Sequence, residues 1–200
     1  MKRVVIVEDN QAERFILKGL LEMNGMTVVA ECGNGVEAVS ACKHRTPDIV
    51  IMDLNMPAMD GLEASEKINT VCPAPIVLLT ATEDPSVINR ALEAGVMSYL
   101  VKPIRQEELL PAIEFAILRF KEHQALLELK KENVSLKDAI KARKLIERAK
   151  GLLMEKEHLS EDEAFSRLRR LSMNKRRPMG DIAELIIGVL SNKNSVPKGD

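Results

Sequence analysis

Aromatic residues are scarce in this sequence of 200 residues, which contains four Phe, one Tyr and no Trp. A surface that stacks single-stranded bases on aromatic rings needs several such side chains together, so that class of nucleic-acid binder is excluded. Long apolar runs are also absent, and none approaches the roughly 20 residues that cross a bilayer. The N-terminus enters a strand-like run directly, without a signal-peptide pattern. We therefore expect a cytoplasmic protein with no membrane partner.

Cysteine is rare as well. Cys32, Cys42 and Cys72 are odd in number and lack metal-ligand spacing, so we interpret them as reduced thiols. Charge is abundant but unevenly distributed. Residues 1–118 carry ten basic and seventeen acidic side chains, a net charge of −7, whereas residues 119–200 carry nineteen and thirteen, a net charge of +6. The basic part is suited to nucleic acid, although an ordinary Lys-rich helical surface explains the charge equally well.

The first half alternates between strand-like and helix-like segments, which predicts an α/β fold with a parallel sheet. Five runs rich in β-branched residues are separated by amphipathic segments. The predicted strands lie near residues 3–8, 27–31, 48–53, 76–80 and 97–101. The predicted helices cover residues 11–24, 35–44, 61–70, 86–94 and from 105 onward.

Polar sites follow four of these runs, each where a predicted strand ends. They are Glu8-Asp9, Asp53, Thr80 and Lys102. Because the C-terminal ends of parallel strands line one crevice of an open sheet, we expect these residues to converge. The resulting pocket would hold three carboxylates, a hydroxyl and an ammonium group.

This set of groups fits the transfer of a phosphoryl group to an aspartate beside Mg²⁺. Asp53 is the candidate nucleophile, since a carboxylate can form an acyl phosphate. Mg²⁺ is held in proteins by one or two carboxylates together with phosphate oxygens and water. The predicted ligands are Asp9 directly, Glu8 through water, Asp53, and the backbone carbonyl of Asn55. Lys102 would pair with Asp53 at rest and with phosphoryl oxygens afterwards.

The same motifs resemble the receiver domain of two-component response regulators, over about residues 1–120. The resemblance implies a five-stranded, doubly wound, flavodoxin-like fold that takes its phosphoryl group from a sensor histidine kinase. It also implies that Thr80 moves toward the phosphoryl group and that Tyr99, at the aromatic switch position, rotates inward. A receiver that is no longer phosphorylated would usually lack one of the motifs, and none is missing. The matching positions are Glu8-Asp9, Asp53, Asn55-Met56-Pro57, Asp60-Gly61, Thr80-Ala81 and Lys102-Pro103.

A heptad pattern follows the receiver-like segment. Apolar residues recur at spacings of three and four, with one Asn at an a position, which is typical of a dimeric coiled coil of defined register. An amphipathic helix that packs on its own domain is the alternative, because only about two clean heptads are present. The seam residues are Leu126, Leu129, Asn133, Leu136 and Ile140.

The last part of the sequence predicts three helices within residues 137–190. Ser160 and Glu163 form a capping box that begins the second helix, and Pro178 fits the start of the third. Spacing predicts that Phe165 and Val189 belong to the core. The tail from residue 191 to 200 is polar.

This region resembles the ANTAR domain, an RNA-binding module named after the AmiR and NasR antiterminators. The resemblance rests on the run Ala149-Lys150-Gly151-Leu152-Leu153-Met154, followed at the expected distances by Ala164-Phe165 and Ser172-Met173. It implies binding to paired stem-loops in nascent mRNA. Basic side chains could grip phosphates and stack on splayed bases. The predicted RNA-binding residues are Arg143, Lys150, Arg169, Lys175, Arg176 and Arg177.

The sequence thus predicts a receiver domain at 1–118, a helical linker or coiled coil at 119–136, an ANTAR domain at 137–190 and a tail at 191–200. The predicted function is phosphorylation-controlled transcription antitermination by a homodimer, with no enzymatic output beyond phosphoryl transfer and hydrolysis at Asp53. A DNA-binding output would need a basic recognition helix, and the third helix carries no Lys or Arg. An output that binds a protein partner is the other alternative.

Overall fold

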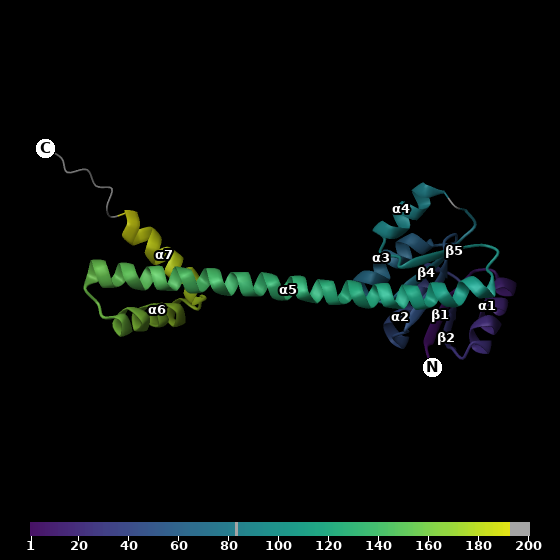
Figure 1. Ribbon diagram of the computed structural model, residues 1–200, viewed down its shortest axis with the longest axis horizontal. Helices are drawn as coiled ribbons and strands as arrows, with labels where there is room; N and C mark the ends of the chain where they lie inside the picture. The colour runs from purple at the N-terminus through teal and green to yellow at the C-terminus, as the bar shows by residue number, and fades with distance from the viewer. Residues whose placement is uncertain (83, 193–200) are drawn as a thin grey trace. The chain divides into compact units, whose positions relative to one another are not determined.

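The computed structural model describes residues 1–82 and 84–192 and contains a sheet flanked by helices, followed by a helical region (Figure 1). Five parallel strands lie in the order β2-β1-β3-β4-β5, which is the doubly wound arrangement that the sequence predicts. The strands are β1 (Arg3–Val7), β2 (Thr27–Cys32), β3 (Ile49–Asp53), β4 (Ile76–Thr80) and β5 (Ser98–Val101). The helices are α1 (Gln11–Met23), α2 (Gly35–Arg45), α3 (Gly61–Val71), α4 (Pro85–Glu93), α5 (Gln106–Glu157), α6 (Glu161–Lys175) and α7 (Met179–Asn192).

Short polar residues begin most of the helices. The side chains of Asn10, Asn34, Asp60 and Asp84 accept hydrogen bonds from the first backbone N–H groups of α1, α2, α3 and α4. Such caps satisfy N–H groups that have no partner within the helix, and each contributes about 1 kcal/mol. They fix where each helix begins, which is directly after the loops that carry the polar sites.

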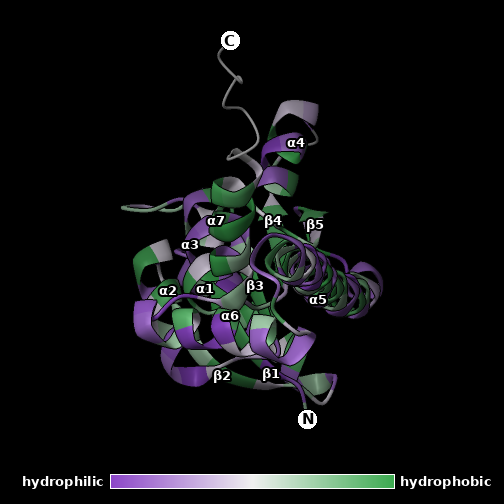
Figure 2. Ribbon diagram, turned by 90° about the vertical axis from the view of Figure 1, so that its left-hand side faces the viewer, coloured by the Kyte–Doolittle hydropathy of each residue, from purple (hydrophilic) through white to green (hydrophobic). Residues whose placement is uncertain are grey.

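The sheet separates two hydrophobic cores. On one face α2, α3 and α4 pack against the strands through residues such as Cys42, Ile68 and Ala91. On the other face α1 and α5 do so through Leu21 and Ile113, among others. The central strands β1, β3 and β4 are therefore buried on both sides, as near-continuous apolar runs require, and Figure 2 shows them mostly in the hydrophobic colour.

Gly61 allows the loop after β3 to close tightly behind Asp53. A Cβ atom at this position would lie 2.4 Å from the backbone carbonyl oxygen of Asp53 and 3.0 Å from the Cα atom of Leu54. The Gly61 N–H also donates to the Leu54 carbonyl at 2.8 Å. Only a residue without a side chain permits this approach, so Gly61 fixes the backbone that holds Asp53.

The chain divides into two compact units after Leu126, within α5. In the second unit, the C-terminal part of α5 packs with α6 and α7 around a core that includes Leu153, Leu168 and Ala183. These are the three helices predicted for residues 137–190, and the Ser160–Glu163 capping box is formed as expected. The predicted tail begins two residues too early, because α7 continues through Asn192; positions 193–200 lie outside the described residues.

Two core predictions in this unit are wrong. Phe165 is 44% exposed and Val189 is 62% exposed. The buried positions of α6 are Ala164 and Leu168, and Phe165 lies one residue to the side of that stripe. A three-helix unit covers only a narrow face of each helix, so residues that flank the stripe remain open to solvent.

Candidate functional site

Two strand ends bring the three predicted acidic residues together. Asp53 is the last residue of β3 and is buried, Glu8 directly follows β1 and is also buried, and Asp9 beside it is exposed. Each of the three offers a carboxylate oxygen, and these oxygens all lie within 4.8 Å of one another. The convergence predicted from the parallel sheet is thus confirmed for this part of the pocket.

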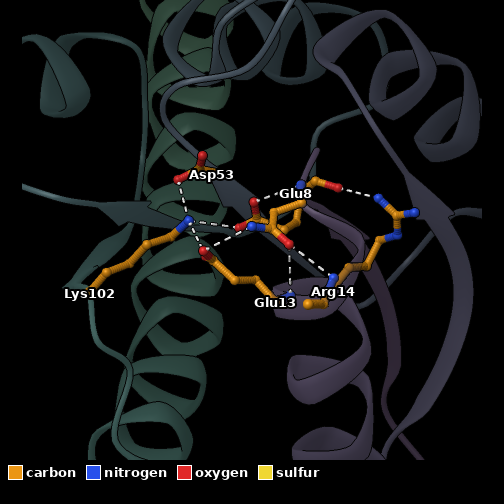
Figure 3. Close-up of polar contacts among 7 residues, drawn as sticks. Glu8, Glu13, Arg14, Asp53 and Lys102 are labelled. Carbon is orange, nitrogen blue, oxygen red and sulfur yellow. Dashed lines mark hydrogen bonds and ion pairs between the residues drawn. The ribbon is translucent and has the colours of Figure 1, made fainter.

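Lys102, directly after β5, places its ammonium among these carboxylates (Figure 3). Its Nζ atom lies 3.0 Å from Oδ1 of Asp53 and 2.8 Å from Oε2 of Glu8. A third carboxylate, that of Glu13 in the first turn of α1, is also 2.8 Å away. The peptide bond from Lys102 to Pro103 is cis.

Burial and charge alter the proton affinities in this pocket. Burial raises the pKa of Glu8 and of Asp53, and the hydrogen bond that each accepts from Lys102 only partly opposes this. Burial acts to lower the pKa of Lys102, but hydrogen bonds to Glu13, Glu8 and Asp53 outweigh it and raise this pKa. Lys102 therefore stays protonated, while the carboxylates favour a further cation that would relieve their repulsion.

The donor set fits Mg²⁺. Carboxylate oxygens are the ligands that this ion prefers, and it uses few of them because it retains several waters. The exposed carboxylate of Asp9 lies on the solvent side of the cluster, while Glu8 and Asp53 supply buried oxygens. Asn55 is exposed in the loop after β3, in the same part of the chain as Asp53.

The two predicted switch residues are not engaged with Asp53. The hydroxyl of Thr80, the last residue of β4, is buried and lies 3.2 Å from both the backbone N and the backbone O of Thr82. Tyr99 in β5 is 41% exposed.

Sequence analysis missed two residues that shape this pocket. Glu13 holds Lys102 across 89 positions of the chain, and Arg14 donates from its guanidinium to the backbone carbonyl of Glu8 (Figure 3). Glu13 follows Asn10 by three residues, a pattern that indicates local capping of α1. The contact of Glu13 with Lys102 becomes visible only in the folded sheet, where the C-terminal ends of β1 and β5 lie along the same edge.

The second unit displays most of its predicted basic residues. Arg143 on α5 and Arg169 on α6 are exposed, and the α6–α7 turn exposes three consecutive basic side chains, Lys175, Arg176 and Arg177. Arg176 caps the end of α6 with a left-handed backbone, at φ 51°. A β-carbon makes this conformation unfavourable, so glycine is the usual residue there.

Lys150 differs from the other predicted RNA-binding residues because it is only 9% exposed. Its ammonium lies 2.7 Å from Glu161, the first residue of α6, and 3.1 Å from Glu147 one turn earlier on α5. It therefore links α5 to the beginning of α6. Gly151 beside it is exposed, and a Cβ atom there would meet nothing within 4 Å, so close helix packing does not explain this glycine.

Comparison with known families agrees with both halves of this structure. Residues 4–114 match the response regulator receiver domain, and residues 135–187 match the ANTAR domain. The chain is a response regulator. It belongs to the group in which a receiver domain precedes an ANTAR domain.

Relatives of this response regulator include full-length and receiver-only proteins. The transcriptional regulatory protein PdtaR of Mycobacterium tuberculosis is 42% identical over 189 residues, which cover 94% of this chain and 91% of PdtaR. The chemotaxis protein CheY of Bacillus subtilis is 38% identical over 56% of this chain and 93% of its own. Among solved structures, the receiver domain of a modulated diguanylate cyclase from Desulfovibrio desulfuricans has a TM-score of 0.57 and 32% identity, covering 62% of this chain and 98% of that one.

The predicted dimer seam of this response regulator lies on the exposed surface of α5. Leu126, Leu129, Asn133, Leu136 and Ile140 are all exposed. Val134, an apolar residue outside the seam, is exposed as well. Among the residues that the structure describes, no helix is long and apolar enough to cross a membrane.

Proposed function

We propose that this response regulator is phosphorylated on Asp53 and that phosphorylation controls binding of its ANTAR domain to RNA. The observation that carries the proposal is the position of Asp53, which is buried beside Glu8 and lies 3.0 Å from Lys102. A carboxylate that is held next to a fixed ammonium, within a cluster suited to Mg²⁺, is equipped to accept a phosphoryl group. A sensor histidine kinase in the cytoplasm would be the donor.

In the proposed reaction, a phosphoryl group moves from a nitrogen or oxygen atom of the donor to a carboxylate oxygen of Asp53. A bond forms from an Asp53 carboxylate oxygen to phosphorus as the bond from phosphorus to the donor breaks. Bound Mg²⁺ supplies positive charge to the two anions that approach each other. Glu8, Asp9, Asp53 and the Asn55 carbonyl would hold this ion, and Lys102 would donate a hydrogen bond to a phosphoryl oxygen. Later attack by water on phosphorus returns Asp53 and releases phosphate, and the protein performs no other reaction.

Movements of two side chains would couple phosphorylation of Asp53 to a change at the protein surface. The Thr80 hydroxyl now contacts the backbone of Thr82 and would turn to donate to the phosphoryl group. Tyr99, which is partly exposed, would rotate into the space that Thr80 leaves. The face formed by α4, β5 and α5 would then change shape.

The ANTAR domain would bind paired stem-loops in nascent mRNA and thereby prevent formation of a terminator. Arg143, Arg169 and the turn from Lys175 to Arg177 are exposed and suited to phosphates and to splayed loop bases. Lys150 stands in the predicted set, but its two ion pairs favour a structural role.

A homodimer would present two ANTAR domains to two stem-loops. The exposed apolar seam on α5 could pair with a second copy, and the second binding event would gain from the high effective concentration. Proline at Asn133 would break the helix at the seam, at a cost of about 3 kcal/mol or more. Asn133→Pro is therefore expected to abolish tight RNA binding while Asp53 is still phosphorylated, and retained tight binding would contradict the dimer.

A salt titration tests the output. The phosphorylated protein is titrated with a two-stem-loop RNA, with a duplex DNA of equal length and with a scrambled RNA, each at several salt concentrations. Binding to the stem-loops with a steep salt dependence is expected, because phosphate contacts release counterions. Preference for the duplex DNA would overturn the proposal. We do not expect this preference, because α7, the last described helix, contains no basic residue that could contact DNA in the major groove.

A protein partner is the second candidate output, and one observation favours it. A groove of about 440 Å³ lies between the end of α5, α6 and α7; its lining is mostly apolar, and its charged residues are Lys175, Arg177 and the ion pair of Arg167 with Glu157. An amphipathic helix with acidic side chains would match both features. If none of the nucleic acids in the titration binds the protein, in either phosphorylation state, this function would be favoured. The apolar wall residues include Leu153, Leu171, Ile182, Leu185, Ile186 and Val189.

A further inference from the structure

Glu13 adds a fourth carboxylate to the phosphorylation pocket. It lies in the first turn of α1, its side chain is 48% exposed, and its Oε2 atom is 2.8 Å from Nζ of Lys102. Figure 3 shows it on the side of Lys102 away from Asp53. It is outside the group of Glu8, Asp9 and Asp53 whose oxygens could share one metal ion.

The contacts of Lys102 leave it no free donor. An ammonium group carries three N–H bonds, and Glu8, Glu13 and Asp53 each lie within hydrogen-bond distance of it. Lys102 can donate to a phosphoryl oxygen only if one of these carboxylates releases it. A metal ion would occupy oxygens of Glu8 and Asp53, so Glu13 is the carboxylate that would continue to hold Lys102.

Glu13 also lies close to Asp53, where phosphorylation would add negative charge. Its Oε2 atom and Oδ1 of Asp53 lie 2.8 and 3.0 Å from the same nitrogen, so they are at most 5.8 Å apart. A phosphoryl group on Asp53 would bring further negative charge into this space, whereas a metal cation would bring positive charge. Because solvent reaches Glu13, the interaction is of the size found for exposed ion pairs, about 0.4–1 kcal/mol or a factor of two to five.

We propose that Glu13 is a positioning residue that acts through Lys102 and has opposite effects on the two states of the pocket. In the unphosphorylated protein it holds Lys102 and adds negative charge, which favours Mg²⁺. In the phosphorylated protein its negative charge lies close to that of the phosphoryl group and opposes it, which lowers the phosphorylated fraction. This inference rests on the proposed phosphorylation of Asp53.

Two measurements on the full chain test this role with Glu13→Gln and the matched control Glu22→Gln. Glu22 is an exposed carboxylate on the same helix, so its replacement removes the same charge away from the pocket. Calorimetry without phosphodonor gives the Mg²⁺ affinity. Acetyl phosphate at saturating Mg²⁺, with separation of phosphorylated protein on a phosphate-affinity gel, gives the donor concentration for half-maximal phosphorylation. In this reaction phosphorus moves from acetate oxygen to Asp53 oxygen, and acetate leaves.

Glu13→Gln is expected to weaken Mg²⁺ binding about two- to fivefold and to lower the half-maximal acetyl phosphate concentration by a similar factor. Both differences are expected to shrink at high salt, while Glu22→Gln behaves as wild type. If Glu13→Gln weakens both Mg²⁺ binding and phosphorylation, the substitution causes a structural defect and the proposal is overturned. The proposal is also overturned if Glu13→Gln and Glu22→Gln give the same values in both measurements. If the wild-type protein is not phosphorylated at all, the proposed function fails, and an unchanged Mg²⁺ affinity in Glu13→Gln would separately refute the role of Glu13.

Discussion

The seam on α5 supports a quantitative prediction about dimer stability. Leu136 is 56% exposed in the single chain, and burial of a whole Leu side chain contributes about 1.5–3 kcal/mol. Covering the exposed half would thus contribute about 0.8–1.5 kcal/mol in each chain, and Leu136→Ala loses most of it in both chains. A loss of about 1.5–3 kcal/mol corresponds to a dissociation constant roughly 10- to 150-fold higher.

Analytical ultracentrifugation of the phosphorylated protein measures this constant directly. Val134→Ala is the matched control, because Val134 is 60% exposed on the same helix but lies outside the seam. We expect Val134→Ala to dimerise as the wild type does. Equal weakening by both substitutions, or no weakening by Leu136→Ala, would refute the assignment of the seam.

Four further predictions concern single side chains. Burial raises the pKa of Asp53 above 3.8, so the folded state binds its proton more readily than the unfolded state; without Mg²⁺, the free energy of unfolding should rise more in wild type than in Asp53→Asn as pH falls through the raised pKa toward 3.8, as urea titrations can measure. Gly151→Ala should raise the free energy of unfolding by about 0.5–1 kcal/mol, because Gly151 is an exposed helical glycine with open space around it. A simultaneous loss of RNA affinity would indicate that RNA contacts the helix at this position. Arg176→Gly should leave the melting temperature equal or higher but reduce the slope of log K against log salt for RNA by about 1. Lys150→Met should lower the melting temperature more than Arg143→Met and reduce that slope less.

The sequence was sufficient to predict the α/β unit closely. Each of its strands and helices lies within a few residues of its predicted position, because apolar runs of four or five residues and short polar caps mark the boundaries unambiguously. The acidic pocket could be predicted for a related reason. In a parallel sheet, the C-terminal ends of the strands lie along one edge, so Glu8, Asp53 and Lys102 converge whatever the details of packing.

Predictions that depend on side-chain reach or on the width of a buried face were less successful. Glu13 contacts Lys102 through a side chain that local patterns assign to helix capping. Lys150 has the sequence pattern of a surface lysine, with Glu147 one turn earlier on the same helix, but Glu161 pairs with it only once α6 begins beside α5. Phe165 and Val189 fit a helical apolar stripe, yet a small three-helix unit buries fewer positions than the stripe contains.

The central claim is that the phosphorylation state of Asp53 controls RNA binding. The most direct test measures the affinity of the full chain for a leader RNA with two stem-loops, with and without acetyl phosphate and Mg²⁺, and repeats it with Asp53→Ala. We expect tight binding only with the phosphodonor, and no such gain in Asp53→Ala. Equal affinity in all four conditions would contradict the claim.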